Sequence, residues 1–324
     1  MKNLDALNSP LSPGDERWDP RTPPRTSVVI PAKDRVRELE RAIDTVLAQT
    51  DGDFEVVVVD DGSESPLELV LGSSYRDPRL RFVRQANTGP AGARNAGVLA
   101  ARGKYVAFLD SDDTWEPTKL ERQVERFLAR PELALVGTGV RFRRDDGAGH
   151  DEVRSVVPGT PRIWELLHMT TPSVMFQRSA FIGAGGFSRD LFFMEDKELF
   201  LRIGLRRPFE TIPEPLTIVH FHPQQTTRCV LKHLGWIEKF EHDTRTFARR
   251  VAPLMRPLEW RHLARKVSIL EGDIAVMFAE HGARGKAVRA QSISTLLSPL
   301  DLEGWRRLAR ILRTTSKAKT HVEP

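Results

Sequence analysis

Residues 104–117 of the 324-residue chain read Lys-Tyr-Val-Ala-Phe-Leu-Asp-Ser-Asp-Asp-Thr-Trp-Glu-Pro, an apolar run that ends in three aspartates. The run from Tyr105 to Leu109 has the length and the aromatic and β-branched content of a buried strand. At its carboxyl end, where open parallel α/β sheets bind ligands, stand Asp110, Asp112 and Asp113. Two carboxylates one residue apart suit a hard divalent cation such as Mg²⁺ or Mn²⁺. An isolated Asp-x-Asp is also common in solvated turns, so the flanking sequence has to decide.

The flanking sequence alternates between strands and helices. Its apolar spacing predicts strands at 26–31, 54–59, 80–83 and 105–109 and helices at 36–49 and 89–101. Further strands are expected at 132–140, 173–177 and 216–219, and the pattern becomes helical after residue 230. Strands that alternate with helices at this spacing imply crossover connections and a mostly parallel sheet. The expected fold class is therefore α/β, with a Rossmann-like layered sheet and a helical C-terminal extension.

Acidic residues also follow the first two predicted strands, at Asp34 and at Asp60 with Asp61. If the strands are parallel and adjacent, these carboxylates meet the Asp110 cluster at one edge, where a cation or ligand donors must offset their repulsion. A nucleotide meets both needs, because its base and ribose donate hydrogen bonds and its diphosphate requires a metal. Arg94 could add a positive charge near the phosphates or the base, and a surface salt bridge is the alternative.

Several function classes are disfavoured by the sequence. The turn 31–35 contains no G-x-G-x-x-G, and the chain has no G-x-x-x-x-G-K-[ST] loop. The single cysteine, Cys229, excludes an internal disulfide. The net charge is +5, but no RNA-binding strand or zinc-finger spacing accompanies it, so we expect no nucleic-acid partner. No apolar stretch approaches the roughly 18 residues of a membrane span, which favours a cytoplasmic protein.

A second acidic pair, Glu195 and Asp196, opens a predicted helix. Negative charge is favoured in the first turn of a helix by the macrodipole, so a purely structural role is one interpretation and catalysis is the other. His220 and His222 follow the strand expected at 216–219. Either histidine could reach a diphosphate or a metal, and a hydrogen-bonded structural histidine is the alternative.

Composition divides the chain into three expected parts. Residues 1–25 are polar and rich in proline, which predicts a disordered tail. Residues 26–225 form the α/β domain, and residues 226–324 form a helical region in which arginine and lysine are concentrated. A basic amphipathic helix is expected at 302–313. It could contact the inner face of an anionic membrane, or it could pack on the α/β domain.

Six short blocks follow one another along the chain. They are Pro31–Arg35, Val59–Ser63, Gly92–Gly97, Gly103–Asp113, Gly185–Phe187, and Glu195–Asp196 with Leu199–Arg202. In this order the chain resembles the family 2 glycosyltransferases of the GT-A fold over residues 26–222. The resemblance implies an inverting transferase that uses a nucleotide-diphosphate sugar, with UDP favoured, and Mn²⁺ or Mg²⁺. The acceptor would be a hydroxyl of a glycan, a lipid-linked glycan or a small molecule, in the synthesis of cell-surface polysaccharide, glycolipid or glycoconjugate.

The resemblance also assigns roles to residues. The expected nucleotide-sugar contacts are Pro31, Ala32, Asp34, Asp60, Asp61, Arg94, Asp110 and Ser111. The expected metal ligands are Asp110, Asp112, Asp113 and His222. Asp196 is the expected general base, with Glu195 beside it in the catalytic pair. Lys33 departs from the aromatic residue often found before Asp34, which leaves the identity of the base open.

Two other functions stay open at this stage. A sugar-phosphate nucleotidyltransferase shares the α/β layering, but it normally holds its triphosphate with a glycine-rich loop, and Pro31–Arg35 contains no glycine. The other alternative is a catalytically silent subunit that only binds nucleotide sugar. Acidic residues are present at every motif position, which argues against the loss of catalytic activity.

Overall fold

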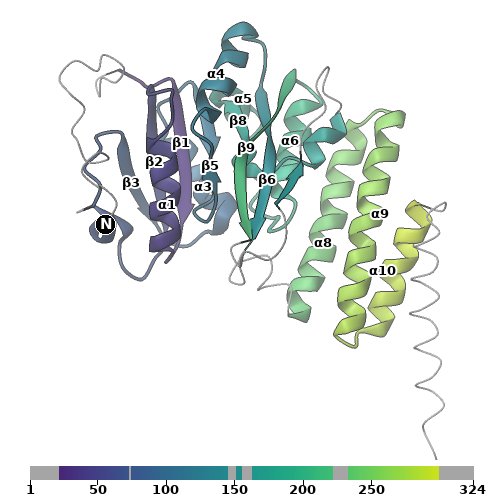
Figure 1. Cartoon of the computed structure of the whole chain (residues 1–324). Coiled ribbons are helices and arrows are strands. Elements are labelled where there is room, and N and C mark those ends of the chain that lie inside the picture. Colours follow the sequence, from purple (N-terminus) through teal and green to yellow (C-terminus); the bar gives the residue numbers. More distant parts are fainter. Residues whose placement is uncertain (1–21, 73, 145–150, 155–162, 222–232, 299–324) are drawn as a thin grey trace, which may run out of the picture. The chain divides into compact units, whose positions relative to one another are not determined.

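The computed structural model describes residues 22–72, 74–144, 151–154, 163–221 and 233–298 (Figure 1). Contacts divide the chain into two compact units. The first contains the chain up to Asp190 together with Leu199–His222, and the second contains Leu191–Glu198 together with the chain from Pro223 onward. Most of the expected tail, the expected helix at 302–313 and His222 lie outside the described residues.

A nine-stranded sheet forms the centre of the first unit. Its strands are β1 (Thr26–Ala32), β2 (Phe54–Asp61), β3 (Leu80–Gln85), β4 (Tyr105–Phe108), β5 (Thr114–Trp115), β6 (Leu135–Arg144), β7 (Glu152–Arg154), β8 (Val174–Gln177) and β9 (Phe209–Phe221). The strand order is β3-β2-β1-β4-β8-β6-β9-β5, and β7 pairs with β6. The first four strands are parallel, as are β6 and β9, whereas β8 is antiparallel to both of its neighbours. The predicted α/β fold with a mostly parallel sheet is confirmed.

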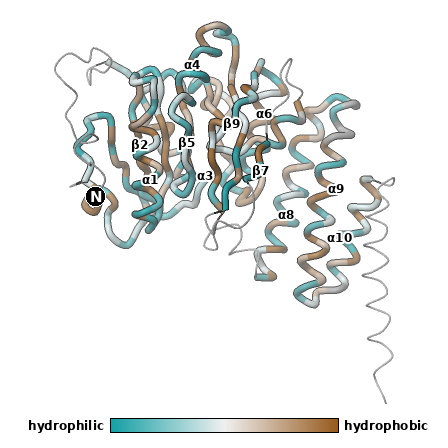
Figure 2. The backbone as a smooth tube through the Cα atoms, in the orientation of Figure 1, coloured by the Kyte–Doolittle hydropathy of each residue, from teal (hydrophilic) through white to brown (hydrophobic). Residues whose placement is uncertain are grey.

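Helices cover both faces of this sheet. They are α1 (Val36–Leu47), α2 (Leu67–Leu71), α3 (Gly89–Ala100), α4 (Lys119–Ala129), α5 (Arg178–Gly183) and α6 (Glu195–Gly204). Val28 and Ile30 of β1 share a core with residues of α1 and α4, while Val29 faces α3. α3 packs closely because of Gly97, where a Cβ atom would lie 2.2 Å from the side chain of Val29. Figure 2 shows the hydrophobic colouring of the central strands.

The second half of the sheet differs from the sequence prediction in its boundaries. β6 begins at Leu135 and continues to Arg144, and β7 pairs with it as the return strand of a hairpin. The strand expected at 216–219 is the final part of β9, which starts at Phe209. Pro213 and Pro215 conceal the strand in the sequence, because proline cannot donate to a ladder. A register shift of β6 beside them accommodates both prolines.

Three helices form most of the second unit: α8 (Leu234–Val251), α9 (Pro257–Glu280) and α10 (Arg284–Leu297). On α9, four apolar residues at helical spacing are buried, namely Leu263, Val267, Leu270 and Ile274. Ile237 and Phe240 of α8 join the same core, and Phe193 enters it from the segment Leu191–Glu198. Within the described residues, no helix combines the length and the apolar character that crossing a membrane requires.

Candidate active site

The carboxyl ends of the parallel strands bring the predicted acidic residues to one edge of the sheet. Ala32 at the end of β1 lies opposite Asp60 at the end of β2, and Val29 lies opposite Phe108 in β4. The residues that follow these three strands therefore converge, as the sequence predicted. We call this edge the acidic rim, formed by Asp34, Asp60, Asp61, Asp110, Asp112 and Asp113.

Arg94 lies at the rim and bonds to Asp110. Its Nη2 donates to Asp110 Oδ1 at 2.6 Å, and its guanidinium lies 5.4 Å from the centre of the Phe187 ring. Asn95 fixes Phe187 by donating to its carbonyl oxygen and accepting from its amide, both at 2.9 Å. The turn before Phe187 depends on Gly186, whose φ is 69°. Arg94 is 6% exposed and the side chain of Asp110 is 28% exposed, so their ion pair is partly buried.

Asp112 bonds to two arginines, Arg35 directly before α1 and Arg41 within it. Arg35 Nη1 lies 2.5 Å from Asp112 Oδ2, and Arg41 Nη2 donates to the main-chain oxygen of Asp112 at 2.9 Å. The side chain of Asp112 is 14% exposed. Charge-assisted hydrogen bonds of this kind are stronger than neutral ones. The carboxylate is therefore oriented and compensated by Arg35.

Asp113 is a buried carboxylate of the rim, 4% exposed. Burial raises the pKa of Asp113 well above its ordinary value, and the neighbouring charges of Asp110 and Asp112 raise it further. The His220 amide opposes this rise by donating to Asp113 Oδ1 at 3.1 Å. The His220 ring bonds to the Thr114 hydroxyl at 2.9 Å, so it has a structural partner.

Asp60 and Asp61 organise the loops that surround the rim. Asp60 accepts hydrogen bonds from the amides of Ser63 and Leu67, at 2.8 and 3.1 Å. Asp61 accepts from the amides of Thr88 and Gly89, at 2.8 and 2.9 Å. These bonds attach the end of β2 to the first turns of α2 and α3.

Asp34 is exposed and has a backbone φ of 54°. Its amide donates to the Ser63 hydroxyl at 3.0 Å, and its Oδ1 accepts from the Glu64 amide at 2.8 Å. A positive φ is costly for a residue with a side chain and is found most often at functional sites. Of the other predicted contacts, Ala32 and Ser111 are buried and Pro31 is partly exposed.

Asp196 and Glu195 begin α6 and belong to the second unit. Asp196 Oδ1 accepts from the Lys197 amide at 2.7 Å, and Lys197 Nζ lies 2.9 Å from Asp196 Oδ2. The preceding residue, Met194, has a φ of 66°. The predicted helix start is confirmed, and Asp196 pairs with Lys197, a residue to which the sequence assigned no role.

The rim offers oxygen donors that fit a divalent cation. In the part of the chain that the structure describes, no three His, Cys, Asp or Glu side chains are grouped to hold a metal by themselves. Mg²⁺ is commonly held by one or two carboxylates together with substrate phosphates, and Asp110 and Asp112 can supply such oxygens. Burial first, and the charges of Asp110 and Asp112 after it, raise the pKa of Asp113, and a cation beside these carboxylates would offset their mutual repulsion.

Arg35, Asn95 and Phe187 lie in the sequence blocks named above, but nothing in those blocks predicts which residues they contact. Arg35 reaches Asp112 across 77 positions, and Asn95 reaches Phe187 across 92. Contacts between residues so far apart in the chain produce no periodic pattern in the sequence. The only hint at Arg35 is its place directly after Asp34 in the first rim turn.

The chain is similar in sequence to known proteins. Residues 27–188, half of the chain, match the family model described as glycosyl transferase family 2. An uncharacterized glycosyltransferase of Rickettsia bellii is 31% identical over 206 residues, which cover 63% of this chain and 30% of that protein. The succinoglycan biosynthesis protein ExoO of Rhizobium meliloti is 44% identical over 104 residues, 32% of this chain and 30% of that protein. The chain spans 25 to 33% of the length of such curated relatives.

Solved structures resemble this chain over most of its length. TarS residues 1–349 from S. aureus, in complex with UDP, has a TM-score of 0.61 and 18% identity, with 92% of each chain covered. The mannosyltransferase PcManGT from Pyrobaculum calidifontis, in complex with GDP-Man and Mn²⁺, has a TM-score of 0.56 and 19% identity, with 99% of this chain and 94% of that chain covered. At these identities the likeness shows the fold.

Proposed function

The chain belongs to glycosyl transferase family 2 and has the GT-A fold, and on this premise we propose that it is an inverting, metal-dependent transferase acting on a nucleotide-diphosphate sugar. The observation that carries the proposal is the acidic rim, where Arg94 holds Asp110 and Arg35 holds Asp112. A nucleoside diphosphate offers donors to carboxylates and anionic oxygens to guanidinium groups or a cation. The rim therefore presents partners for both ends of such a ligand.

Donor recognition is the first step that these residues would perform. We assign contacts with the base to Asp34 and Asp61 and contacts with the ribose to Asp110, while Arg94 compensates negative charge beside them. UDP is the favoured nucleotide, in keeping with the UDP complex of TarS, although PcManGT binds GDP-Man. Asp61 contributes mainly by fixing the turn before α3, since its oxygens already accept two backbone amides.

Asp112, together with Asp110 or Asp113, would hold Mn²⁺ or Mg²⁺, and His222 remains a predicted ligand outside the described residues. When bound, the cation would act as a Lewis acid for the departing diphosphate. The ion pair of Asp112 with Arg35 competes for the same carboxylate oxygen. We therefore expect the metal alone to bind weakly, and the metal with nucleotide to bind well.

Proton transfer is assigned to Asp196. An acceptor hydroxyl is a weak nucleophile at neutral pH, and a carboxylate within hydrogen-bond reach can take its proton as it attacks the anomeric carbon. A bond from the acceptor oxygen to that carbon forms while the bond to the diphosphate breaks, and the electron pair leaves with the diphosphate. Attack from the opposite face inverts the anomeric centre. The name of ExoO favours an acceptor from cell-surface polysaccharide synthesis, and a glycolipid or glycoconjugate acceptor stays open.

Calorimetry with UDP and Mn²⁺ tests the proposal. Replacement Asp112→Asn removes a ligand charge and should weaken metal-dependent UDP binding by at least about tenfold, or roughly 1.4 kcal/mol. Asp44→Asn is the matched control, because Asp44 is an exposed carboxylate of α1 away from the rim. Equal affinities of the two variants would remove Asp112 from the metal site. A panel of UDP-, GDP- and dTDP-sugars, with the anomeric configuration of the product read by NMR, then tests donor and stereochemistry.

A further inference from the structure

Asp243, near the middle of α8, is a fully buried carboxylate that bonds to the segment preceding Asp196. Its Oδ2 accepts hydrogen bonds from the amides of Phe192 and Phe193, at 2.9 and 3.0 Å. Its Oδ1 pairs with Lys239 Nζ at 2.5 Å, and its side chain is 0% exposed. A buried carboxylate is stable only with such partners, so Asp243 holds the amides of Phe192 and Phe193 in a fixed orientation.

Side-chain packing also holds Phe192 and Phe193 in place. Phe193 lies in the core of the helical unit with Phe240, at 5.0 Å between ring centres. Phe192 contacts Trp236 at 4.7 Å between ring centres. Backbone amides and side chains of the two phenylalanines are therefore both anchored to α8 (Leu234–Val251).

The next residue, Met194, has a φ of 66° in the left-handed region. Such a conformation is unfavourable for a residue with a side chain and persists only where its surroundings determine it. On one side lie the amides bound by Asp243, and on the other the Met194 carbonyl accepts the Glu198 amide at 3.0 Å, at the start of α6. The backbone direction in which α6 starts is thus fixed two residues before Asp196.

We propose that Asp243 is a positioning residue, which holds Phe192–Met194 so that α6 presents Asp196 to the acceptor hydroxyl. The inference rests on the proposed role of Asp196 as general base. It makes the helical unit, which lies outside residues 27–188 of the family match, part of the catalytic apparatus. A misplacement of about 1 Å can cost a hundredfold in rate, so a distant carboxylate can control kcat without touching the substrate.

The first test measures hydrogen exchange of peptides that cover residues 191–196 in the full chain. In Asp243→Leu, the amides of Phe192 and Phe193 lose their acceptor, and we expect their exchange to become at least tenfold faster. Asp243→Asn retains an oxygen at the same place and should keep most of the protection. Unchanged protection in Asp243→Leu would overturn the inference. If that variant does not fold, Asp243→Glu replaces it, because the added methylene displaces the acceptor while the charge stays.

The second test separates kcat from donor binding. Asp243→Leu should lower kcat by about tenfold to a hundredfold, with the KM for donor and the UDP affinity unchanged, and Asp243→Asn should restore most of the activity. The control is Glu271→Gln on α9, which disturbs the ion pair of the fully buried Glu271 with the partly exposed Arg245 of α8. An equal loss of kcat in Glu271→Gln would show a general effect of stability and overturn the inference. Retained transfer in Asp196→Asn would overturn the proposed base instead.

Discussion

Asp60 and Asp113 lie on the same rim, and their surroundings move their pKa values in opposite directions. Burial acts to raise the pKa of Asp60, but hydrogen bonds from Ser63 and the Leu67 amide, with the charge of Arg84, lower it overall. Burial raises the pKa of Asp113, and the charges of Asp110 and Asp112 add to the rise. Hydrogen bonds to an ionised carboxylate stabilise it, and like charges do not. Asp60 is thus a carboxylate bound by the Ser63 and Leu67 amides, whereas Asp113 is a buried carboxylate beside two other acidic side chains.

The sequence predicts the rim carboxylates better than their partners. Asp110 and Asp61 could be placed because they end apolar strands, and strand ends meet at one edge of a parallel sheet. Arg35 and Asp243 could not, since each acts on a residue at least 50 positions away. Asp243 also reads as an ordinary helical partner of Lys239, four residues earlier. The specific pairing depends on tertiary packing, which a single sequence does not encode locally.

Asp196→Asn tests the proposed general base at this scale. The amide keeps the shape of the side chain but cannot take a proton, so transfer should fall by roughly 10² to 10⁴ while donor affinity stays nearly constant. Steady-state kinetics with calorimetry of UDP binding would measure both quantities. A structural role at the helix start instead predicts a stability loss of about 0.3–1 kcal/mol and retained activity.

Glu195→Gln is the control for this prediction. Glu195 shares the first turn of α6 with Asp196, but it points from a different side of the helix. If both variants lose activity equally, the pair acts through the local helix structure. Asp196 would then no longer be assigned as the base.

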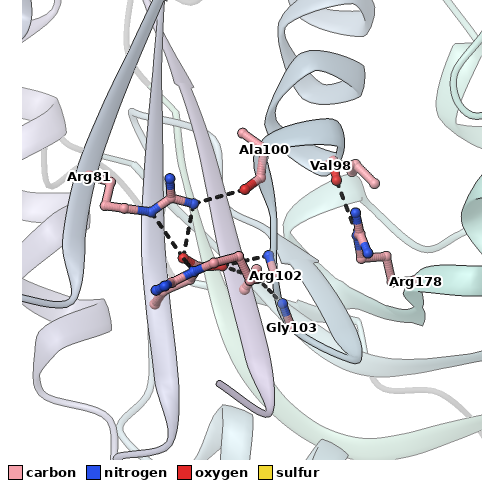
Figure 3. Close-up of polar contacts among 8 residues, drawn as sticks. Arg81, Val98, Ala100, Arg102, Gly103 and Arg178 are labelled. Carbon is pink, nitrogen blue, oxygen red and sulfur yellow. Dashed lines mark hydrogen bonds and ion pairs between the residues drawn. The ribbon is translucent and has the colours of Figure 1, made fainter. Parts of the chain in front are cut away.

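Among the elements, the amino end of β2 is secured by polar contacts around Glu55, with Arg81 and Arg102 labelled in Figure 3. Glu55 lies at the opposite end of β2 from Asp60 and Asp61 of the rim. Glu55 is fully buried and accepts from the Ser27 hydroxyl and the Arg102 amide, both at 2.7 Å. The side chains of Arg81 and Arg102 each donate to its other oxygen at 3.0 Å. Arg81 also donates to the Ala100 carbonyl at the end of α3, at 2.8 Å. The cluster joins β1, β2, β3 and α3.

Glu55→Gln should lower the free energy of unfolding by about 1–3 kcal/mol, because charged hydrogen bonds are lost inside the protein. Burial acts to raise the pKa of Glu55, but the bonds from Ser27 and Arg102 outweigh it and lower the pKa below its ordinary 4.5. The ionised form therefore stabilises the fold above pH 4.5, and this contribution disappears as pH falls through the lower folded-state pKa. Urea unfolding at pH 7 and at pH 3 should show a stability difference between wild type and variant that shrinks at the lower pH.

Two comparisons make the Glu55 prediction specific. Donor affinity should not change, since the cluster and the rim lie at opposite ends of β2. Glu132→Gln provides the exposed counterpart, because Glu132 pairs with Arg130 at the surface, where solvent screens the interaction and little stability depends on it. If the difference in unfolding free energy between wild type and Glu55→Gln does not change with pH, the altered shape of the side chain, and not its charge, is responsible.

At the scale of the whole molecule, the sequence correctly predicted the α/β sheet and the change to helices. It did not predict that Leu191–Glu198 groups with the helical unit, although residues on both sides of it belong to the first unit. In the sequence, Phe192 and Phe193 are apolar residues that could pack into the core of either unit. The choice is made by Asp243 and by the aromatic residues of α8, which act together only in the folded protein.

Each unit has its own hydrophobic core, so we predict two unfolding transitions in calorimetry of the full chain. UDP with Mn²⁺ should stabilise the transition of the first unit, which carries the rim, by about 2.7 kcal/mol at a hundredfold excess over Kd. For a unit of this size that corresponds to a rise in Tm of roughly 5–10 °C. Glu271→Gln should instead lower the transition of the helical unit and leave the ligand-induced shift intact. A single transition that moves as a whole with either change would show that the segment Leu191–Glu198 couples the two cores into one cooperative structure.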